Sequence, residues 1–365
     1  KCEVYPLHLV QCVSCELLQL NYTVPKETMF SNHKYMSGSS KMLLNHFDDM
    51  AQENVYQFNL QPHDLIVDIG GNDGSQLLSY KKLGCENVIN VESASNIAHY
   101  STEEEVTTLN EFFNEECAKL FFEEGQTKLV NAAGVFFHLE ELHSVIKGIK
   151  YILASDGVFV VQCMYAGAMI DNLNFDTIYH EHLCYYTLKT LEDLLSPYGL
   201  RVFDARTSPI HSGSLIVKVS HLESKFPDTE RLSEAREQDK LYDPASFQRF
   251  AGTIRRSKNK VKEFLMTLKP SSIYAYGAPA KGNTLLNYYD LDNSLIEKAV
   301  EVNELKIGYK TPGSNIPVTQ ESIEDVPDYY FLLSHNLGED ILERNKDLRK
   351  EGLKFIIPFP EIEII

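Results

Sequence analysis

The chain has 365 residues, of which 43% are hydrophobic and 24% are charged, and this is typical of a soluble protein with two or three domains. Its formal net charge of −18 disfavours a nucleic-acid partner, because proteins that bind DNA or RNA carry a basic surface. No apolar run reaches the length of a membrane span, and the seven cysteines form no disulfide-like framework. We therefore expect a cytoplasmic protein that meets neither membranes nor nucleic acids.

The first 50 residues show little regular pattern, but they hold two informative features. Cys12 and Cys15 have the spacing of half a structural zinc site, which needs four ligands. Cys2 is the only other cysteine nearby, and its spacing does not complete a second pair, so zinc binding and a zinc-free turn are both open. The polar run 35–40 has the composition of a linker.

Apolar runs separated by helix-like segments follow the N-terminal part. They comprise residues 65–69, 88–92, 129–133 and 157–161. Such continuous runs predict a parallel sheet with helices on both faces. The next two runs, 200–203 and 214–219, are too close together for a crossover helix. They predict an antiparallel pair at the end of the sheet.

The first apolar run continues into a glycine-rich turn at residues 68–74. Gly70 and Gly74 allow a tight turn and the close approach of a ligand to the backbone. Glu92 ends the next run, where a carboxylate can accept hydrogen bonds from ribose hydroxyls. The aspartates of the turn repel pyrophosphate but suit a sulfonium cation, so the pattern favours S-adenosylmethionine over a dinucleotide. A glycine turn without a ligand is the alternative.

Titratable side chains are densest at residues 176–182, which read Asp-Thr-Ile-Tyr-His-Glu-His. His, Glu and Tyr are the usual general acids and bases, so the segment predicts proton-transfer chemistry, although a solvated turn is the simpler alternative. Tyr179, Glu181 and His182 can converge only on an irregular backbone, because neither a helix nor a strand puts all three on one face. We therefore expect a loop or turn, with His180 pointing elsewhere.

The C-terminal third begins with the charged segment 225–268, whose apolar residues recur at helical spacing. A second alternation of strands and helices follows. Its apolar runs comprise residues 272–276, 298–302, 330–333 and 354–357. Between the first run and a helix lies the turn 277–283, where Lys281 either meets an anion at the helix N-terminus or is solvated in a structural turn. No Ser or Thr follows this lysine, so the turn is not a P-loop.

The chain resembles the S-adenosylmethionine-dependent sugar C-methyltransferases that act on nucleotide-linked 4-keto-deoxysugars. The resemblance covers nearly the whole chain in order. Its Tyr-His-Glu-His and Gly-Ala-x-Ala-Lys-Gly-Asn-Thr motifs are specific, whereas the glycine turn alone is not. The matching segments are 5–7, 12–15, 68–74, 135–138, 175–182, 211–214 and 276–284.

This resemblance implies an α/β fold in three parts. They are a small N-terminal part of the zinc-binding type, a class I, Rossmann-like methyltransferase sheet, and a second Rossmann-like domain at the C-terminus, with the substrate between the last two. The expected boundaries are 1–50 for the N-terminal part with its cofactor-covering segment, 51–224 for the methyltransferase domain, 225–268 for a helical linker and 269–365 for the C-terminal substrate domain.

The resemblance also implies roles for individual residues. His182 would act as the base, with Tyr179, Glu181 and His138 around the sugar. The expected cofactor contacts are Tyr35, Ser40, Asp68, Gly70, Asn72, Gly74, Glu92 and Asn131. The expected substrate contacts are Lys281 and Asn283, and the zinc ligands would be Cys12 and Cys15. Gly134 departs from the family, which usually has asparagine there, and this puts in doubt any contact that an asparagine side chain would make.

Together these features predict an S-adenosylmethionine-dependent C-methyltransferase acting on a nucleotide-linked 4-keto-deoxysugar, at C3 by analogy with the family. Methylation of carbon requires a base to remove the weakly acidic hydrogen beside a ketone and a donor to stabilise the enolate oxygen. An imidazole, with an ordinary pKa of about 6.5, suits the base. An O- or N-methyltransferase and a non-catalytic binding protein on the same fold are the alternatives, and a nicotinamide oxidoreductase is the least favoured.

Overall fold

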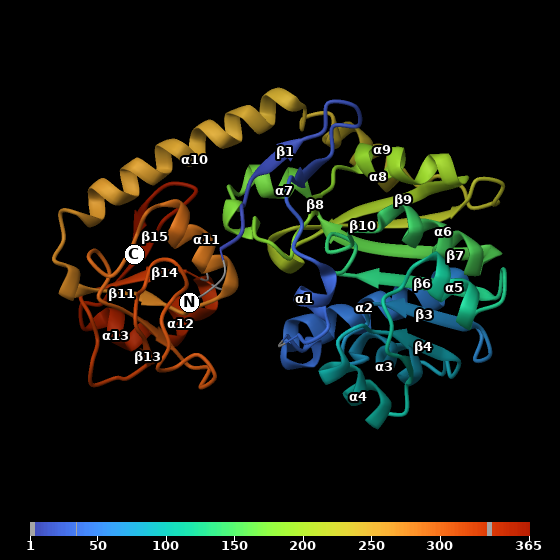
Figure 1. The fold of residues 1–365 in the computed structure, drawn as a ribbon, viewed down its shortest axis with the longest axis horizontal. Coiled ribbons are helices and arrows are strands. Elements are labelled where there is room, and N and C mark those ends of the chain that lie inside the picture. The colour runs from blue at the N-terminus through green and yellow to red at the C-terminus, as the bar shows by residue number, and fades with distance from the viewer. Residues whose placement is uncertain (1–3, 34, 334–337) are drawn as a thin grey trace. The chain divides into compact units, whose positions relative to one another are not determined.

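The computed structural model describes residues 4–33, 35–333 and 338–365 (Figure 1). The chain divides into two compact units. The large unit comprises residues 5–167 and 180–241, and the small unit consists mainly of residues 168–179 and 242–365. Among the described residues, no helix is both long enough and apolar enough to cross a membrane.

The large unit is built on a seven-stranded sheet with the order β5-β4-β3-β6-β7-β10-β9. The first five strands in this order run parallel, and β10 pairs antiparallel with both β7 and β9. The strands are β3 (Leu65–Ile69), β4 (Val88–Val91), β5 (Thr107–Leu109), β6 (Thr127–Ala133), β7 (Leu153–Met164), β9 (Leu200–Ser208) and β10 (Ser214–His221). The predicted parallel sheet and its antiparallel end are confirmed.

Helices pack along this sheet because its strands are apolar on both faces. All five residues of β3 are buried, and Ile66 lies in one core cluster with Phe58 of α2 and Tyr80 of α3. The helices are α2 (Lys41–Phe58), α3 (Ser75–Lys82), α4 (Ser95–Glu103), α5 (Glu115–Phe121), α6 (Leu142–Ile152), α8 (Leu188–Leu195) and α9 (Glu230–Asp239).

A small three-stranded sheet in the large unit joins the N-terminal segment to the chain that follows the histidine motif. Its order is β1-β2-β8, with β1 at Leu9–Gln11, β2 at Leu18–Leu20 and β8 at Cys184–Tyr185. The N–H of Leu20 also donates to Leu183 O at 2.9 Å. The short helix α1 (Lys26–Phe30) follows β2. These bonds hold the chain in place directly after His182.

The small unit contains a six-stranded sheet with the order β13-β12-β11-β14-β15-β16, in which only β16 runs antiparallel to its neighbour. Its strands are β11 (Ile273–Tyr276), β12 (Lys298–Glu301), β13 (Val318–Gln320), β14 (Tyr329–Leu332), β15 (Lys354–Ile357) and β16 (Glu363–Ile364). Its helices are α10 (Pro244–Leu265), α11 (Ala280–Tyr288), α12 (Gly338–Arg344) and α13 (Lys346–Lys350). The expected second α/β sheet is therefore present.

Two features of the architecture were not visible in the sequence pattern. The charged segment 225–268 contains α9 and α10, which fall into different compact units. Residues 168–179, which lie between strands of the large unit along the chain, pack with the C-terminal sheet instead. The short helix α7 (Ala166–Asp171) spans this division. Contacts between segments far apart in sequence decide both features, and a local pattern does not report such contacts.

Candidate active site

The glycine turn after β3 and the end of β4 form one corner of the large sheet, which we call the large-unit corner (residues 70–74 and Glu92). Gly70 has a φ of +67°, and its N–H donates to Val91 O at 2.8 Å. The carboxylate of Glu92 accepts the N–H of Asn72 at 2.9 Å and that of Ala94 at 2.7 Å. The acidic group thus lies at the carboxyl ends of parallel strands, where ligands of open α/β sheets bind.

A buried, incompletely paired polar cluster lies beneath this turn. A Cβ on Gly71 would lie 2.5 Å from Asn90 Oδ1 and 2.7 Å from Asp68 Oδ2, so only glycine fits. Neither of these oxygens has a hydrogen-bond partner among the described residues. Burial, followed by the nearby charge of Glu92, raises the pKa of Asp68 well above its ordinary value. An unpaired buried carboxyl is costly, so a cationic nucleoside suits this corner better than a pyrophosphate.

The polar run 35–40 lies over the large-unit corner and is bonded to it. Asn72 Oδ1 accepts the N–H of Ser37 at 2.9 Å, and Asn72 Nδ2 donates to Tyr35 O at 3.1 Å. Asp73 Oδ2 accepts the N–H of Gly38 at 2.7 Å. Burial and the charge of Asp73 raise the pKa of Tyr35. Of the two interpretations left open by the sequence, these bonds favour a covering segment over a linker.

Three residues expected at the cofactor make contacts that support the fold. The Ser40 side chain caps α2 by accepting the N–H of Leu43 at 3.3 Å. Gly74 has a φ of +81°, and a side chain there would collide with α4. Asn131 is fully buried, and its Oδ1 accepts from Tyr80 OH at 3.2 Å. These contacts stabilise the glycine turn and the start of α2. The cofactor contacts expected of the three residues remain predictions.

Two of the predicted catalytic histidines lie ring against ring in the large unit. The rings of His138 and His182 are 5.3 Å apart with an interplanar angle of 15°. Phe30 stacks on His138 at 5.2 Å, and Phe137 meets His182 edge to face at 4.9 Å. The N–H of Leu183 donates to Phe137 O at 2.8 Å, so the backbone itself ties the two histidine segments together.

The surroundings of His138 fix its protonation state. Burial and the neighbouring His182 lower the pKa of His138 well below its ordinary value. Its Nε2 is buried and has no hydrogen-bond partner among the described residues. A neutral imidazole has one N–H donor and one acceptor nitrogen. His138 is therefore an uncharged group, and the hydrogen-bonding capacity of its Nε2 is unused among the described residues.

His33 is a functional candidate that the sequence did not single out. Its Nε2 lies 3.6 Å from Glu181 Oε2. Its backbone is held by Asn96, whose Oδ1 accepts the N–H of His33 at 2.9 Å and whose Nδ2 donates to His33 O at 2.6 Å. The nearby carboxylate of Glu181 raises the pKa of His33, although burial opposes this. Burial opposes ionisation of Glu181, yet His33 holds the pKa of Glu181 below its ordinary value.

The histidine motif has the irregular backbone that was predicted. After a 3-10 turn at Phe175–Thr177, residues 178–183 form neither helix nor strand. His180 Nε2 lies 3.1 Å from Pro6 O, so this side chain points away from His182 toward the N-terminal segment, as expected. The division between the compact units falls between Tyr179 and His180, so Tyr179 is described with the small unit and His182 with the large one.

His211 is a third imidazole near the end of β6. A Cβ on Gly134 would lie 3.5 Å from His211 Nε2, and His211 contributes to the lowered pKa of His138 after burial and two other histidines. The backbone φ of Gly134 is +78°, which favours glycine over asparagine. His211 lies in segment 211–214, one of the segments that carry the resemblance. The sequence did not predict that it lies near His138, because the two residues are far apart along the chain.

In the small unit, Lys281 at the start of α11 has an acidic partner. Its Nζ lies 4.0 Å from Asp176 Oδ2, and the Asp176 side chain is fully buried. Burial raises the pKa of Asp176 to about 7, although Lys281 opposes this. Thr284 Oγ1 donates to Ile178 O at 3.0 Å, which fastens the same segment to α11. Asn283 lies on α11, and its carbonyl accepts Asn287 Nδ2 at 2.7 Å.

The predicted zinc site gains no support. Cys12 and Cys15 lie in the turn between β1 and β2, and Cys2 falls outside the described residues. Across the residues that the structure describes, no group of three or more His, Cys, Asp or Glu side chains is arranged to hold a metal ion. The backbone N–H groups of Cys15 and Ser14 lower the pKa of Cys12, and such bonding suits a thiolate without specifying what it binds.

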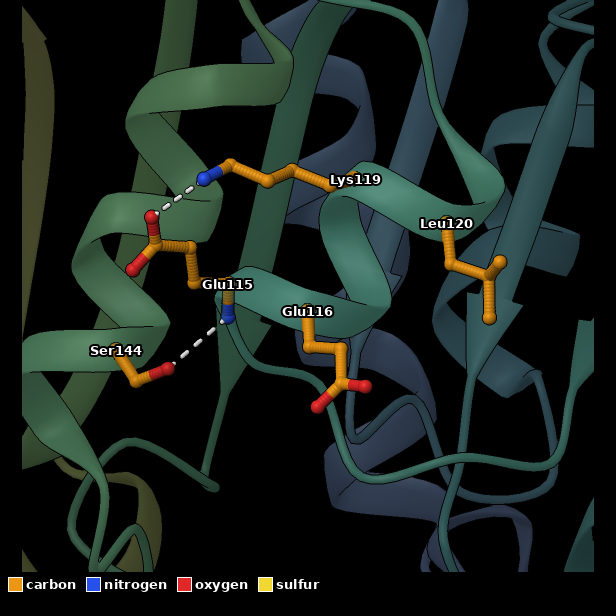
Figure 2. A pocket seen from close by; sticks show the side chains of 5 residues that line it. All are labelled: Glu115, Glu116, Lys119, Leu120 and Ser144. Atoms are coloured by element: carbon orange, nitrogen blue, oxygen red, sulfur yellow. Dashed lines mark hydrogen bonds and ion pairs between the residues drawn. The ribbon is translucent and has the colours of Figure 1, made fainter.

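A shallow surface hollow lies on α5 and α6, away from the residues discussed so far (Figure 2). It is lined by Glu115, Glu116, Lys119, Leu120 and Ser144. Lys119 pairs with Glu115 at 2.7 Å, and the N–H of Glu115 donates to Ser144 Oγ at 3.1 Å. Exposed pairs of this kind contribute little to stability. The hollow contains none of the predicted site residues and offers no chemistry of its own.

The comparisons with known proteins show the family to which the chain belongs. Residues 43–205 match a family profile described as a methyltransferase domain, and residues 209–360 match one described as a C-methyltransferase C-terminal domain. The protein is therefore an S-adenosylmethionine-dependent methyltransferase. The C-methyltransferase NovU from Streptomyces niveus is 30% identical over 371 residues, covering 99% of this chain and 88% of that protein. The chain belongs to the C-methyltransferase family.

Solved structures resemble about half of the chain. The PH0226 protein from Pyrococcus horikoshii OT3 is 13% identical, covers 51% of this chain and 94% of its own, and superposes with a TM-score of 0.43. The geranyl diphosphate C-methyltransferase from Streptomyces coelicolor A3(2) is 11% identical, covers 49% of this chain and 80% of its own, and has a TM-score of 0.39.

Proposed function

We propose that this C-methyltransferase acts on a nucleotide-linked 4-keto-deoxysugar and methylates C3, with His182 as the base. The observation that carries the proposal is the pair of stacked imidazoles in the large unit. His182 is 8% exposed and lies against a neutral His138 whose Nε2 is buried. Carbon alkylation beside a ketone needs a base that accepts a proton and a donor that stabilises the oxygen that becomes negative.

Each imidazole suits one of these two roles. Removal of the hydrogen from C3 leaves an enolate, whose charge gathers on the oxygen at C4. His182 takes the proton at a ring nitrogen. His138 is held uncharged by burial and has a buried Nε2 without a partner among the described residues, so in the Nε2–H tautomer it can donate to the enolate oxygen. A preorganised donor in a dry site stabilises such a charge more strongly than water does.

Glu181 and the large-unit corner provide the supporting contacts. The carboxylate of Glu181 stays ionised beside His33, and an ionised carboxylate stabilises the imidazolium that forms when His182 accepts a proton. Glu92 and the turn at Asn72 would hold the ribose of S-adenosylmethionine, and Asp68 would face its cationic part. The bound cofactor supplies the electrophilic methyl group, because no side chain of a protein can provide one. We also propose Tyr179, Lys281 and Asn283 as contacts to the substrate.

The test combines a substrate panel with an exchange measurement. The wild-type protein is incubated with S-adenosylmethionine and dTDP-, GDP- or CDP-linked 4-keto-deoxysugars, and a methyl mass gain identifies the substrate. Without the cofactor, in deuterated water, we expect His182 to exchange the C3 hydrogen of that substrate. His182→Asn should lower both exchange and methylation by at least about a hundredfold, with binding of S-adenosylmethionine unchanged.

Two results would contradict the proposal. Full turnover by His182→Asn would remove this residue from the role of base. Methylation without any exchange at C3, together with loss of activity when one particular hydroxyl is removed from the substrate, would instead identify an O-methyltransferase. His180→Asn is the matched control, because His180 bonds to Pro6 O and points away from His182. It should retain exchange.

A further inference from the structure

The turn between β9 and β10 holds His211 in an uncommon backbone conformation. His211 and Ser212 have φ values of +55° and +67°, a region that residues other than glycine seldom adopt. Ser214 Oγ donates to Ile210 O at 2.8 Å, and Ile210 lies in one core cluster with Phe47 of α2. Such strain persists only where the surrounding structure imposes it, and it is concentrated at functional sites. The turn is therefore a candidate for more than a connection between two strands.

The turn lies at the carboxyl end of the parallel strands of the large sheet. Ser214, the first residue of β10, pairs with Met164, the last residue of β7. Gly134 directly follows β6, and its N–H donates to Gln162 O of β7 at 3.0 Å. Ligands of open α/β sheets bind at this edge. His211 thus lies on the edge of the sheet where the substrate is expected.

The imidazole of His211 borders an open space beside Gly134. A Cβ on Gly134 would lie 3.5 Å from His211 Nε2, and apart from its neighbours in the chain it would meet no other atom of the described residues within 4 Å. The side chain of His211 is itself exposed. A ligand atom that enters the space left by the glycine therefore comes within reach of this ring nitrogen.

His138 lies near the same space. It follows Gly134 by four residues, and His211 adds to the lowered pKa of His138 after burial and two other histidines. The rings of His138 and His211 are thus close enough to interact electrostatically. Two imidazoles, one from the segment after β6 and one from the turn before β10, approach the site at which we placed the enolate oxygen.

We propose that His211 is a further catalytic residue, which donates a hydrogen bond from Nε2 to the oxygen at C4 beside the donor His138. When the C3–H bond breaks, the proton moves to a ring nitrogen of His182, and the electron pair forms the double bond between C3 and C4. The π electrons of the ketone move to its oxygen. His211 and His138 keep their protons and share the stabilisation of this charge. The inference rests on the proposed function and adds a second donor to it.

Two simpler roles are that His211 supports its own turn and that it binds the ground state of the sugar. Both are tested on the full chain with the keto sugar that the substrate panel identifies. Exchange of the C3 hydrogen in deuterated water without cofactor, at saturating sugar, and steady-state methylation are measured. Calorimetric titration of S-adenosylmethionine and thermal melts report cofactor binding and folding.

The variants differ in whether they keep a donor at the position of Nε2. His211→Leu removes the donor, and His211→Gln keeps an N–H near that position. His211→Asn suits the left-handed backbone, but its amide is too short to replace Nε2. His63→Leu is the matched control, because His63 is exposed and precedes β3, at the opposite edge of the sheet.

We expect His211→Leu and His211→Asn to lower both the exchange rate and kcat by at least about tenfold, because the donor acts on charge that develops in the transition state. Their KM values should change by less than about threefold. His211→Gln should stay within about threefold of wild type in both rates, and His63→Leu should match wild type. The melting temperature and the affinity for S-adenosylmethionine should be the same in all five proteins.

Several results would overturn the second donor while the proposed function stands. These are exchange at the wild-type rate in His211→Leu and His211→Asn, a raised KM with unchanged kcat and exchange, and equal losses in His211→Gln and His211→Leu. A loss confined to variants with a lowered melting temperature has the same meaning. If no keto sugar exchanges its C3 hydrogen or gains a methyl group with wild type, the proposed function fails and the second donor fails with it.

Discussion

Burial decides what the titratable side chains of this protein can do. His138 and His182 are the same residue type, yet burial and its neighbours keep His138 uncharged. A neutral imidazole has one N–H donor and one acceptor nitrogen, so it can either donate to a developing oxyanion or accept a proton as a base. The sequence predicted which residue types the site needs. We propose that packing by Phe30 and Phe137 decides which ring takes which role.

The contact between His33 and Glu181 leads to a prediction at the residue scale. His33→Gln removes the positive partner that keeps Glu181 ionised. We expect kcat/KM to fall roughly fivefold, which corresponds to about 1 kcal/mol, because a partly exposed ion pair is lost. The acidic limb of the pH profile of kcat/KM should move to higher pH, because Glu181 then takes up a proton more readily. Steady-state kinetics between about pH 5 and pH 9 measure both effects.

Two further variants make this test specific. His33→Arg keeps a positive charge beside Glu181 and should restore the position of the acidic limb, even if part of the rate is lost. His63→Gln alters an exposed histidine and should match wild type throughout. A His33→Gln protein with an unshifted pH profile would show that His33 merely holds the covering segment in place.

At the scale of elements, a partly buried ion-pair network joins α2 to the antiparallel end of the large sheet. Lys218 of β10 is 2% exposed, and its Nζ lies 2.7 Å from Glu53 Oε1 of α2. Arg206 and Arg231 also pair with Glu53, at 3.0 and 3.3 Å, and Asp204 lies 3.8 Å from Lys218. A buried charge that loses its partner is expensive, so this network fixes how α2 sits on the sheet.

Glu53→Gln should lower the free energy of unfolding by about 3 kcal/mol at neutral pH, because it leaves the charge of Lys218 with the neutral Gln57 and the more distant Asp204. Urea denaturation followed by circular dichroism measures the change. Glu103→Gln, an exposed change on α4, should shift the free energy by less than about 0.5 kcal/mol. Equal stability of Glu53→Gln and wild type would mean that water, not Glu53, balances the charge of Lys218.

The same network predicts how stability depends on pH. Although burial opposes it, the surrounding cations, Lys218 first, lower the pKa of Glu53 from 4.5 to about 2. A carboxyl group with a depressed pKa stabilises the folded state above its unfolded pKa and loses that contribution as the pH falls through the folded pKa. Between pH 4.5 and about pH 2, wild type should therefore lose more stability than Glu53→Gln. Parallel denaturation curves over this range would contradict the assignment.

At the scale of the whole molecule, the net charge of −18 makes stability sensitive to salt. Repulsion among excess carboxylates destabilises a compact chain, and ions screen it. Exposed ion pairs are weakened by the same screening, but each contributes little. We expect the melting temperature to rise by about 2–4 °C between about 20 and 150 mM NaCl, measured by differential scanning fluorimetry. An unchanged or falling melting temperature would show that ion pairs outweigh the repulsion.

The sequence by itself determined the two parallel sheets and the irregular backbone of the histidine motif, because apolar runs and glycine turns act over a few residues. It also identified Glu92 and His182 as residues of interest. Only the tertiary structure paired His33 with Glu181 and stacked His138 on His182. These relations join residues far apart in the chain. They form only when strands and turns pack together, and a local sequence pattern does not show which distant residues will come into contact.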